Sequence, residues 1–552
     1  MRKATHMVGC AVVILLGCRD AVPDPVEPPS DEVILGLEEM SAPRLLRRTS
    51  LDLRGVLPSL EELERVEADP DALLLLQEEI LADSRFEERL VQIFAQRWHT
   101  TVDEFHGQYY DYFLDSDEEY AFERAVGEEP LRLMARVVAG DRPWSEVVLA
   151  EYSMANQLLA SIWPMEGYPE EGEGWHEVHY TDGRPNVGVL ASNGLWWRYF
   201  TTFFNQNRSR AAAISKLLLC EDLLSRPISF SDDTNLLESD DVTGMVLSEP
   251  TCQGCHVTIE PLASMLFGFW WIDDYSAPEM DTYHPEREVL GSRELNVEPN
   301  YFGKPIAGFG ELGYAISSDD RFSRCAVTSM AESLWHRPVG LGDFASLDLT
   351  HRRFVDGGMQ VKDLILELVR STEFRSGSTN EEATIEIQEQ VRTARILDTS
   401  LLRSMAADLS GFVWESEGFD MLDNDDWGYR ILGVGVDGEY VGVLQSDPSL
   451  TWVLVLRRWA QALSAEVVAH DIIQGARPAV LLEVNPASVP GDTDFETALD
   501  SVFFRLMGVR MTTERQAGLE ALWLELSAVA GPEAAWQGVL GVLLQDPDFV
   551  VY

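Results

Sequence analysis

The stretch that most constrains this chain is Cys-Gln-Gly-Cys-His at residues 252–256. Two thiols separated by two residues and followed directly by a histidine have the spacing of covalent haem c attachment. In such a site Cys252 and Cys255 each bond a vinyl group of the haem, and His256 binds the iron as the proximal axial ligand. The motif therefore predicts one haem c, held by Cys252, Cys255 and His256.

Other chemistries use the same pair of thiols. A Cys-x-x-Cys can be a redox dithiol or half of a zinc site. A zinc site would need a second metal-binding pair, and the other four cysteines are isolated in the sequence: Cys10, Cys18, Cys220 and Cys325. A redox dithiol would need a thioredoxin-like βαβ context, which the flanking residues do not suggest. A vestigial motif that carries no haem stays open as an alternative.

The N-terminus resembles an export signal. Arg2 and Lys3 precede an apolar run, Met7 to Gly17, which is too short to span a membrane as a mature helix. The run ends in Leu-Leu-Gly-Cys at residues 15–18, which is similar to a bacterial lipobox. In signals of that kind, cleavage precedes the cysteine and its thiol is acylated. The sequence predicts an acylated Cys18 and a lipid-anchored protein of the bacterial cell envelope, with an ordinary signal or an uncleaved anchor as the alternatives.

The six cysteines can then be divided by role. Cys10 is lost with the signal, Cys18 is acylated, and the motif uses two more. Cys220 and Cys325 remain, and an oxidising compartment favours a disulfide between them. Two separately buried thiols are the alternative, because free cysteine is often buried.

Composition limits the classes of function. The chain has 552 residues, enough for two or three domains, and 45% of them are hydrophobic, as in a globular protein. The formal net charge is −51. A surface this acidic repels the phosphates of nucleic acids, so we expect no nucleic-acid partner. It suits solubility or a basic partner protein.

The pattern along the chain predicts a mainly α fold: multi-helix domains, a c-type cytochrome-like haem segment and a few short β-hairpins. The expected organisation is a lipoprotein signal (1–17), a Pro-rich acidic tether (18–40), an N-terminal helical domain (41–160), a haem-containing domain (161–376) and a C-terminal helical domain (377–552).

Local sequence patterns predict individual helices and loops within these domains. Ser59, followed three residues later by Glu62, predicts a helix N-terminus with a capping box. Helical spacing favours a helix over 145–159, whereas 273–300 is polar and predicts a loop. The main basic cluster of the middle region either balances the acidic surface or pairs with haem propionates. Its members are Arg198, Arg208, Arg210 and Lys216.

Several stretches together resemble the large exported bacterial proteins that carry planctomycete-type cytochrome c domains. Arg47 to Ser59, RRTSLDLRGVLPS, is similar to the N-terminal segment of that family. Further similar segments are Asp83–Phe86, Gly188–Ser192, Leu218–Cys220, Cys252–Pro261, Tyr301–Gly303, Phe322–Cys325 and Phe374. The chain departs from the family where Glu260-Pro261-Leu262-Ala263 replaces Asp-Pro-x-Gly. The resemblance implies a haem-binding, mostly helical, exported protein, and it implies no substrate.

The expected function is a lipid-anchored c-type cytochrome that transfers electrons to a redox partner protein. Methionine is a common second axial ligand, and Met280 is the expected one because it lies beyond a turn after the motif. Met265 follows His256 by nine residues on the same expected helix and cannot reach the opposite haem face. Met245, His284 and an open position are the alternatives. The alternative function is a haem-free envelope scaffold or binding lipoprotein; whether the protein is an enzyme is left open.

Overall fold

The structure is a computed structural model. It describes residues 37–105, 112–226, 250–270, 276–381, 383–384, 395–416, 418–425, 427–436, 442, 444–445 and 447–552, without the side chains of residues 251, 277 and 278. The expected signal, Cys18, most of the tether and Met245 lie outside these residues.

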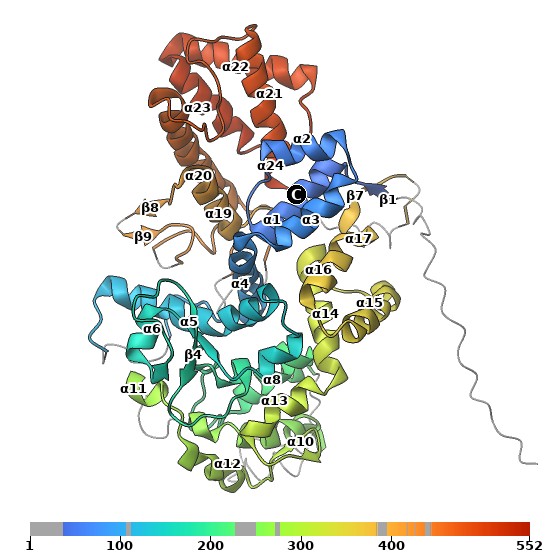
Figure 1. Ribbon diagram of the computed structural model, residues 1–552, viewed down its shortest axis with the longest axis vertical. Helices are drawn as coiled ribbons and strands as arrows, with labels where there is room; N and C mark the ends of the chain where they lie inside the picture. Colours follow the sequence, from blue (N-terminus) through green and yellow to red (C-terminus); the bar gives the residue numbers. More distant parts are fainter. Residues whose placement is uncertain are drawn as a thin grey trace, which may run out of the picture.

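The described chain is mainly helical with a few short strands, as the sequence predicted. Figure 1 shows an elongated molecule in which the C-terminal helices form one end and the middle of the chain forms the other. The first helices are α1 (Ala42–Arg54), α2 (Leu60–Ala68), α3 (Ala72–Leu81), α4 (Ser84–Trp98) and α5 (Ser116–Ala139). The expected capping box is confirmed: Ser59 accepts from the Glu62 backbone N–H, and the Glu62 carboxylate accepts from the Ser59 N–H.

The middle of the chain contains short helices and strands. Before the motif lie η2 (Trp144–Val148), β2 (Ser153–Ala155), α6 (Gln157–Ile162), β3 (Met165–Glu166), β4 (His176–Tyr180), η3 (Gly188–Ala191), α7 (Asn193–Arg198), α8 (Arg208–Leu219) and η4 (Leu223–Ser225). After it come α10 (Pro250–Ser264), η5 (Phe267–Phe269), α11 (Ala277–Met280), η6 (Pro285–Arg287), α12 (Glu288–Leu295), β5 (Asn300–Tyr301) and β6 (Lys304–Pro305).

Longer helices follow. They are α13 (Phe309–Ser317), α14 (Asp320–Trp335), η7 (Leu341–Asp343), α15 (Phe344–Asp356), α16 (Val361–Val369) and α17 (Thr372–Arg375), ending in β7 (Ser376–Thr379). The C-terminal part comprises α19 (Thr399–Ser410), β8 (Glu415–Ser416), β9 (Phe419–Asp420), α20 (Leu450–Val468), η8 (Ala469–Ile473), α21 (Thr493–Met507), α22 (Thr513–Ala530), α23 (Pro532–Leu543) and α24 (Pro547–Val550). The strands form small antiparallel sheets: β1 (Leu37–Glu39) with β7, β2–β4–β3, β5–β6 and β8–β9.

Two local expectations were wrong. The segment 145–159 is not one helix, because Ser153–Ala155 pairs with β4 and Asn156 then caps α6 by accepting from the Leu159 N–H. The segment expected to be a loop, 273–300, contains α11, η6 and α12. Helix α12 packs closely on the end of α10: a Cβ added at Gly291 would lie 1.9 Å from the Ser264 carbonyl oxygen. The missing side chain of Gly291 allows this close approach between the two helices.

Buried apolar side chains form two large clusters and a smaller one. The first cluster runs from α1 to α17, and the second gathers α19 to α24. The third lies around α5, α6 and β4. Residues on both sides of position 160 enter the first cluster, so the division into 41–160 and 161–376 stays a prediction.

Helix α1 belongs to both large clusters. Its Leu46 and Leu53 pack in the first cluster and its Leu51 packs in the second. Arg47 is buried and donates to the carbonyl oxygens of Leu506 (2.7 Å) and Phe549 (2.6 Å). Figure 1 accordingly shows the C-terminus beside α1.

The neighbouring Arg48 extends toward the first cluster instead of toward the C-terminal helices. It donates to the carbonyl oxygens of Phe374 (3.1 Å) and Leu334 (3.3 Å) and lies 3.8 Å from the carboxylate of Asp52. Asp52, also buried, accepts from His336 Nε2 at 2.8 Å. Burial raises the pKa of Asp52, but His336 and Arg48 outweigh it and hold that pKa below its usual range. The carboxylate is therefore charged at neutral pH and neutralises a buried cation between the cores.

We predict that Asp52→Asn lowers the free energy of unfolding by about 3–5 kcal/mol, because it leaves Arg48 buried without a counter-charge. Since the native pKa of Asp52 is lowered, its contribution is full above the unfolded pKa, about 4, and is lost as the pH falls through the native value. Denaturant unfolding at pH 7 and pH 3 measures both effects. Asp348→Asn, which removes two solvent-exposed ion pairs, with Arg324 and with Arg352, is the control and should change little. Equal stability of wild type and D52N at pH 7 would contradict the prediction.

Candidate functional site

The Cys-x-x-Cys-His motif lies in the first two turns of α10. Cys252 and Cys255 are three residues apart and His256 is four residues after Cys252, so the helix brings all three to one face. Both cysteines are unpaired and partly exposed. Pro250 begins the helix, where its missing N–H costs nothing.

A buried carboxylate holds the imidazole of His256. Its Nδ1 lies 2.6 Å from Oε1 of Glu260, one turn further along α10. The His256 side chain is 25% exposed, whereas that of Glu260 is 2% exposed. Within the described part of the chain, His256 Nε2 has no hydrogen-bond partner. In metal sites, a histidine commonly donates the N–H of one ring nitrogen to a carboxylate, and this hydrogen bond orients the imidazole so that the other nitrogen can bind the metal.

Arg208, at the start of α8, makes the second contact to Glu260. Its Nε donates to the same Oε1 at 2.6 Å. Burial raises the pKa of Glu260, but the hydrogen bonds from His256 and Arg208 outweigh it and lower that pKa below its usual range. Glu260 is therefore an anion at neutral pH, and it accepts from both partners.

Further contacts attach the motif helix to η4 and α14. Cys255 Sγ lies 3.5 Å from the Leu223 carbonyl oxygen, and Arg226 donates to the Gly254 carbonyl oxygen at 3.0 Å. Arg226 also pairs with Glu221, which Arg321 of α14 contacts at 2.6 Å.

A cysteine pair joins α8 to α14 nearby. The sulfurs of Cys220 and Cys325 lie at disulfide distance, 2.17 Å apart, with 5.2 Å between the Cα atoms. Cys220 directly follows α8, whose first residue, Arg208, contacts Glu260. The pair therefore links the helix that supports the motif to α14 in the first core.

An open groove borders the motif on one side. It is lined by Gln253, Gly254, His256, Val257, Pro261, Val297, Glu298 and Asn300. His256 lines this groove and neither cysteine does; the Cys255 thiol faces η4 instead. The donor set fits covalent haem attachment: two partly exposed free thiols one turn apart, beside an imidazole with one nitrogen fixed and one free.

The basic cluster is mostly occupied by protein partners. Arg208 binds Glu260, Arg198 donates to the His99 carbonyl oxygen at 2.6 Å, and Arg210 is fully buried among carbonyl oxygens. Burial lowers the pKa of Arg210 to about 9. Pairing of these arginines with haem propionates is therefore not supported by their positions.

The expected second axial ligand lies elsewhere. Met280 is buried in the third cluster, where its carbonyl oxygen accepts from Trp197. Figure 1 shows α11, which ends at Met280, and α10 on opposite sides of the lower part of the molecule, so the structure does not bring Met280 to His256. Of the alternatives, His284 lies near Glu279 (3.5 Å) and Glu286 (3.3 Å). Met265 is buried in the first cluster, at the end of α10.

Sequence reasoning missed the roles of Glu260 and Arg208. The signal for Glu260 is present: His and Glu four residues apart share a helix face. Arg208 is distant in sequence and gave no signal specific to this contact. Across the described residues, no group of three or more His, Cys, Asp or Glu side chains could hold a metal ion, and no helix is long and apolar enough to cross a membrane.

Comparisons with family models, curated proteins and solved structures found no match to this chain.

We predict that Glu260→Gln lowers the free energy of unfolding by about 1–3 kcal/mol, because it weakens two charge-assisted hydrogen bonds to a buried group. The lowered native pKa means that this contribution is full above the unfolded pKa, about 4, and is lost as the pH falls through the native value. Chemical denaturation at pH 7 and pH 3 is the measurement. Glu294→Gln, an exposed residue of α12 paired with its neighbour Arg293, is the matched control. A variant as stable as wild type at pH 7 would show that the carboxylate does not hold His256 and Arg208.

Proposed function

We propose that this chain is a lipid-anchored c-type cytochrome of the bacterial cell envelope, which transfers electrons through one covalent haem. The observation that supports it most is the placing of two free thiols and a carboxylate-held histidine on one helix face. A bound haem would supply a one-electron carrier. Cys252 and Cys255 would hold it covalently, and His256 would bind the iron.

The protein's own residues have definite tasks in this proposal. Glu260 accepts from Nδ1–H, which fixes the tautomer and the orientation of the imidazole and increases its basicity. Arg208 keeps Glu260 charged and in place.

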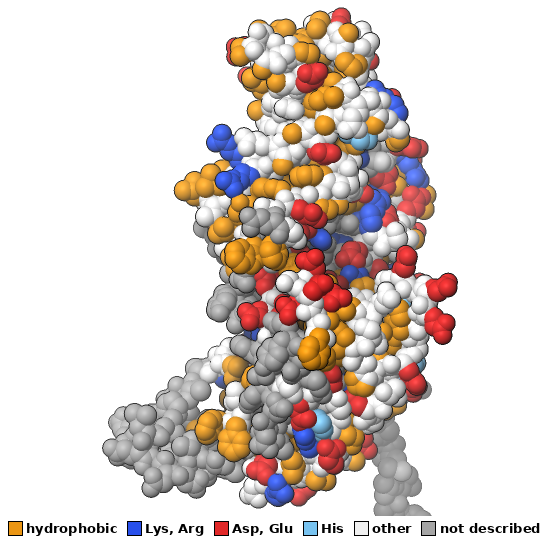
Figure 2. All heavy atoms as spheres, turned by 90° about the vertical axis from the view of Figure 1, so that its left-hand side faces the viewer, with side chains coloured by type: hydrophobic (Ala, Val, Ile, Leu, Met, Phe, Trp, Pro, Cys, Tyr) orange, Lys and Arg blue, Asp and Glu red, His pale blue; other side chains and the backbone are white. Residues whose placement is uncertain are grey.

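A redox partner protein follows from electron transfer, and the charge of the chain suggests its character. Figure 2 shows acidic side chains spread over the height of one face. With a formal charge of −51, long-range attraction favours a basic partner. Such an association should weaken with rising ionic strength, because salt screens exposed charges.

The haem is tested by expressing the full chain with cytochrome c maturation machinery and recording a pyridine haemochrome spectrum. We predict a c-type α band in wild type and its loss in Cys252→Ser/Cys255→Ser. The comparison is Cys220→Ser/Cys325→Ser, which also replaces two cysteines, here the pair at disulfide distance, and should keep the band. If wild type from a competent host lacks the band, the haem-free scaffold or binding lipoprotein is the better account.

The lipid anchor makes a separate prediction. Because Leu-Leu-Gly at 15–17 precedes Cys18, Cys18→Ala should release the protein from the membrane fraction or block its processing. One acyl chain anchors weakly, so firm binding by wild type requires a multiply acylated cysteine. Cell fractionation with and without the substitution is the measurement, and Cys10→Ala within the expected signal is the control. Unchanged fractionation of C18A would contradict the anchor.

A further inference from the structure

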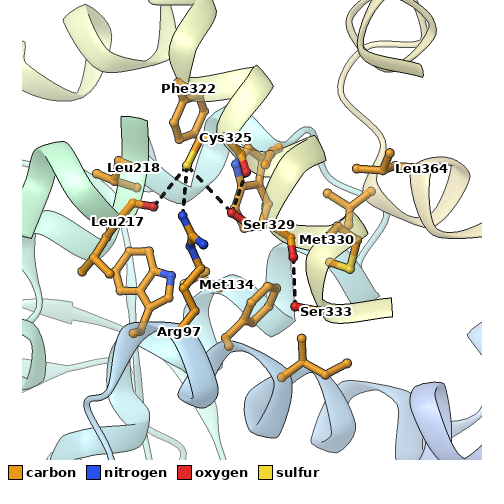
Figure 3. A pocket seen from close by; sticks show the side chains of 16 residues that line it. Arg97, Met134, Leu217, Leu218, Phe322, Cys325, Ser329, Met330, Ser333 and Leu364 are labelled. Carbon is orange, nitrogen blue, oxygen red and sulfur yellow. Dashed lines mark hydrogen bonds between the residues drawn. The ribbon is translucent and has the colours of Figure 1, made fainter. Parts of the chain in front are cut away.

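Two adjoining pockets lie between α4, α8 and α14, and no residue of α10 lines either one. The inner one is a cavity of about 40 Å³ with mainly apolar walls, which include Met134, Phe322 and Leu364. The outer one is a groove of about 410 Å³. They share Ile93, Arg97, Leu217, Ser329 and Ser333. Figure 3 shows Arg97 and the apolar side chains around the inner cavity.

The outer groove is lined mainly by basic residues, whereas the chain as a whole is strongly acidic. Asp and Glu outnumber Lys and Arg by 93 to 42 overall, yet among the described residues that line the groove Glu332 is the only acidic one. Its basic and imidazole residues are Arg97, His99, Lys216, His336, Arg337 and Arg395. A groove of this composition on so acidic a protein favours an anionic ligand.

Four of these six groups already have close acceptors. His336, Arg337 and Arg395 each have a carboxylate within 2.8 Å. His99 Nε2 lies 2.9 Å from the carbonyl oxygens of Gln96 and Gly442. Only Arg97 and Lys216 remain to bind a ligand strongly.

Arg97 has weak acceptors for a half-buried cation. Its Nη2 points at the sulfurs of Cys220 (2.8 Å) and Cys325 (3.6 Å), and sulfur is a poor acceptor. Its Nη1 is 3.5 Å from Glu332, and its buried Nε has no partner among the described residues. Burial lowers the pKa of Arg97, although the charge of Glu332 opposes this shift. A buried donor without a good acceptor costs free energy, and a ligand oxygen would recover it.

Lys216 is the second available cation. Its side chain is 57% exposed, and its ammonium lies 3.3 Å from the carboxylate of Asp222, which is itself 37% exposed, so the ion pair is a weak one. A long, exposed side chain can turn into the groove at little cost.

We propose that the groove binds a small organic carboxylate, with its head between Arg97 and Lys216 and its apolar tail in the inner cavity. The guanidinium suits a carboxylate because its N–H groups match the two oxygens. A cavity of about 40 Å³ has room for a tail of roughly three or four carbon atoms, since one water needs about 10–15 Å³ on this measure. The apolar walls select such a tail over a second charged group.

Calorimetric titration of the full chain at pH 7 and low ionic strength tests the proposal, with pentanoate, acetate and inorganic phosphate as probes. We expect pentanoate to bind at least about tenfold more tightly than acetate, because three more methylenes are buried. Phosphate should bind no better than acetate, since it has no tail.

Variants separate the head from the tail. Arg97→Gln and Lys216→Gln should each weaken pentanoate and acetate about tenfold, by removing a charge-assisted contact. Ala326 lines the inner cavity, so the larger side chain of Ala326→Leu should fill part of it. This variant should bind pentanoate only as tightly as acetate, and its affinity for acetate should be unchanged. Arg65→Gln removes an arginine of similar exposure that pairs loosely with Glu79 outside both pockets, and it should change nothing.

Folding of each variant is checked by its thermal midpoint and by mapping of the Cys220–Cys325 link. If Arg97→Gln does not fold, the affinities of Lys216→Gln for pentanoate and acetate test the binding of the carboxylate head, because Lys216 is exposed and its replacement should not affect folding. Failure of pentanoate to bind wild type at millimolar concentration would overturn the proposal. Equal affinity for pentanoate and acetate, or affinities unaffected by the cation variants, would overturn it too.

Discussion

Two adjacent buried arginines of α1 connect the two large cores of this protein. Arg47 binds carbonyl oxygens of the C-terminal helices, and Arg48 binds carbonyl oxygens at the ends of α14 and α17. Burying two guanidinium groups is costly unless their hydrogen bonds and charges are satisfied. Asp52 supplies the counter-charge on the Arg48 side, so the helix can remain buried along nearly its whole length. The arrangement of the rest of the chain depends on this helix.

Contacts with helices of the first core hold the motif helix α10 in position. Helix α14 receives the Arg48 side of α1 and carries Cys325, whose partner Cys220 follows α8. The other end of α8 supplies Arg208, which holds Glu260 and through it His256. A chain of contacts therefore runs from the junction of the cores to the imidazole. It accounts for a histidine that is partly exposed yet fixed in orientation.

The sequence predicted features that depend on local spacing. The capping box at Ser59, the helical fold class and the motif all follow from residues within one or two turns of each other. Glu260 could have been found by the same rule, since it lies one turn after His256. Arg208 could not, because its contact with Glu260 joins residues 52 apart. The segment 145–159 was assigned wrongly because tertiary pairing with β4 overrode a helical pattern, and Met280 was placed by an assumed turn whose geometry the sequence does not specify.

The central claim is that Cys252 and Cys255 carry a haem with His256 beside it. Mass spectrometry of the proteolysed chain, isolated from a host with cytochrome c maturation, tests it most directly. The account predicts that the peptide containing residues 252–256 carries the mass of one haem, with neither thiol free to alkylate. The same peptide at its unmodified mass, with both thiols alkylated, would contradict it.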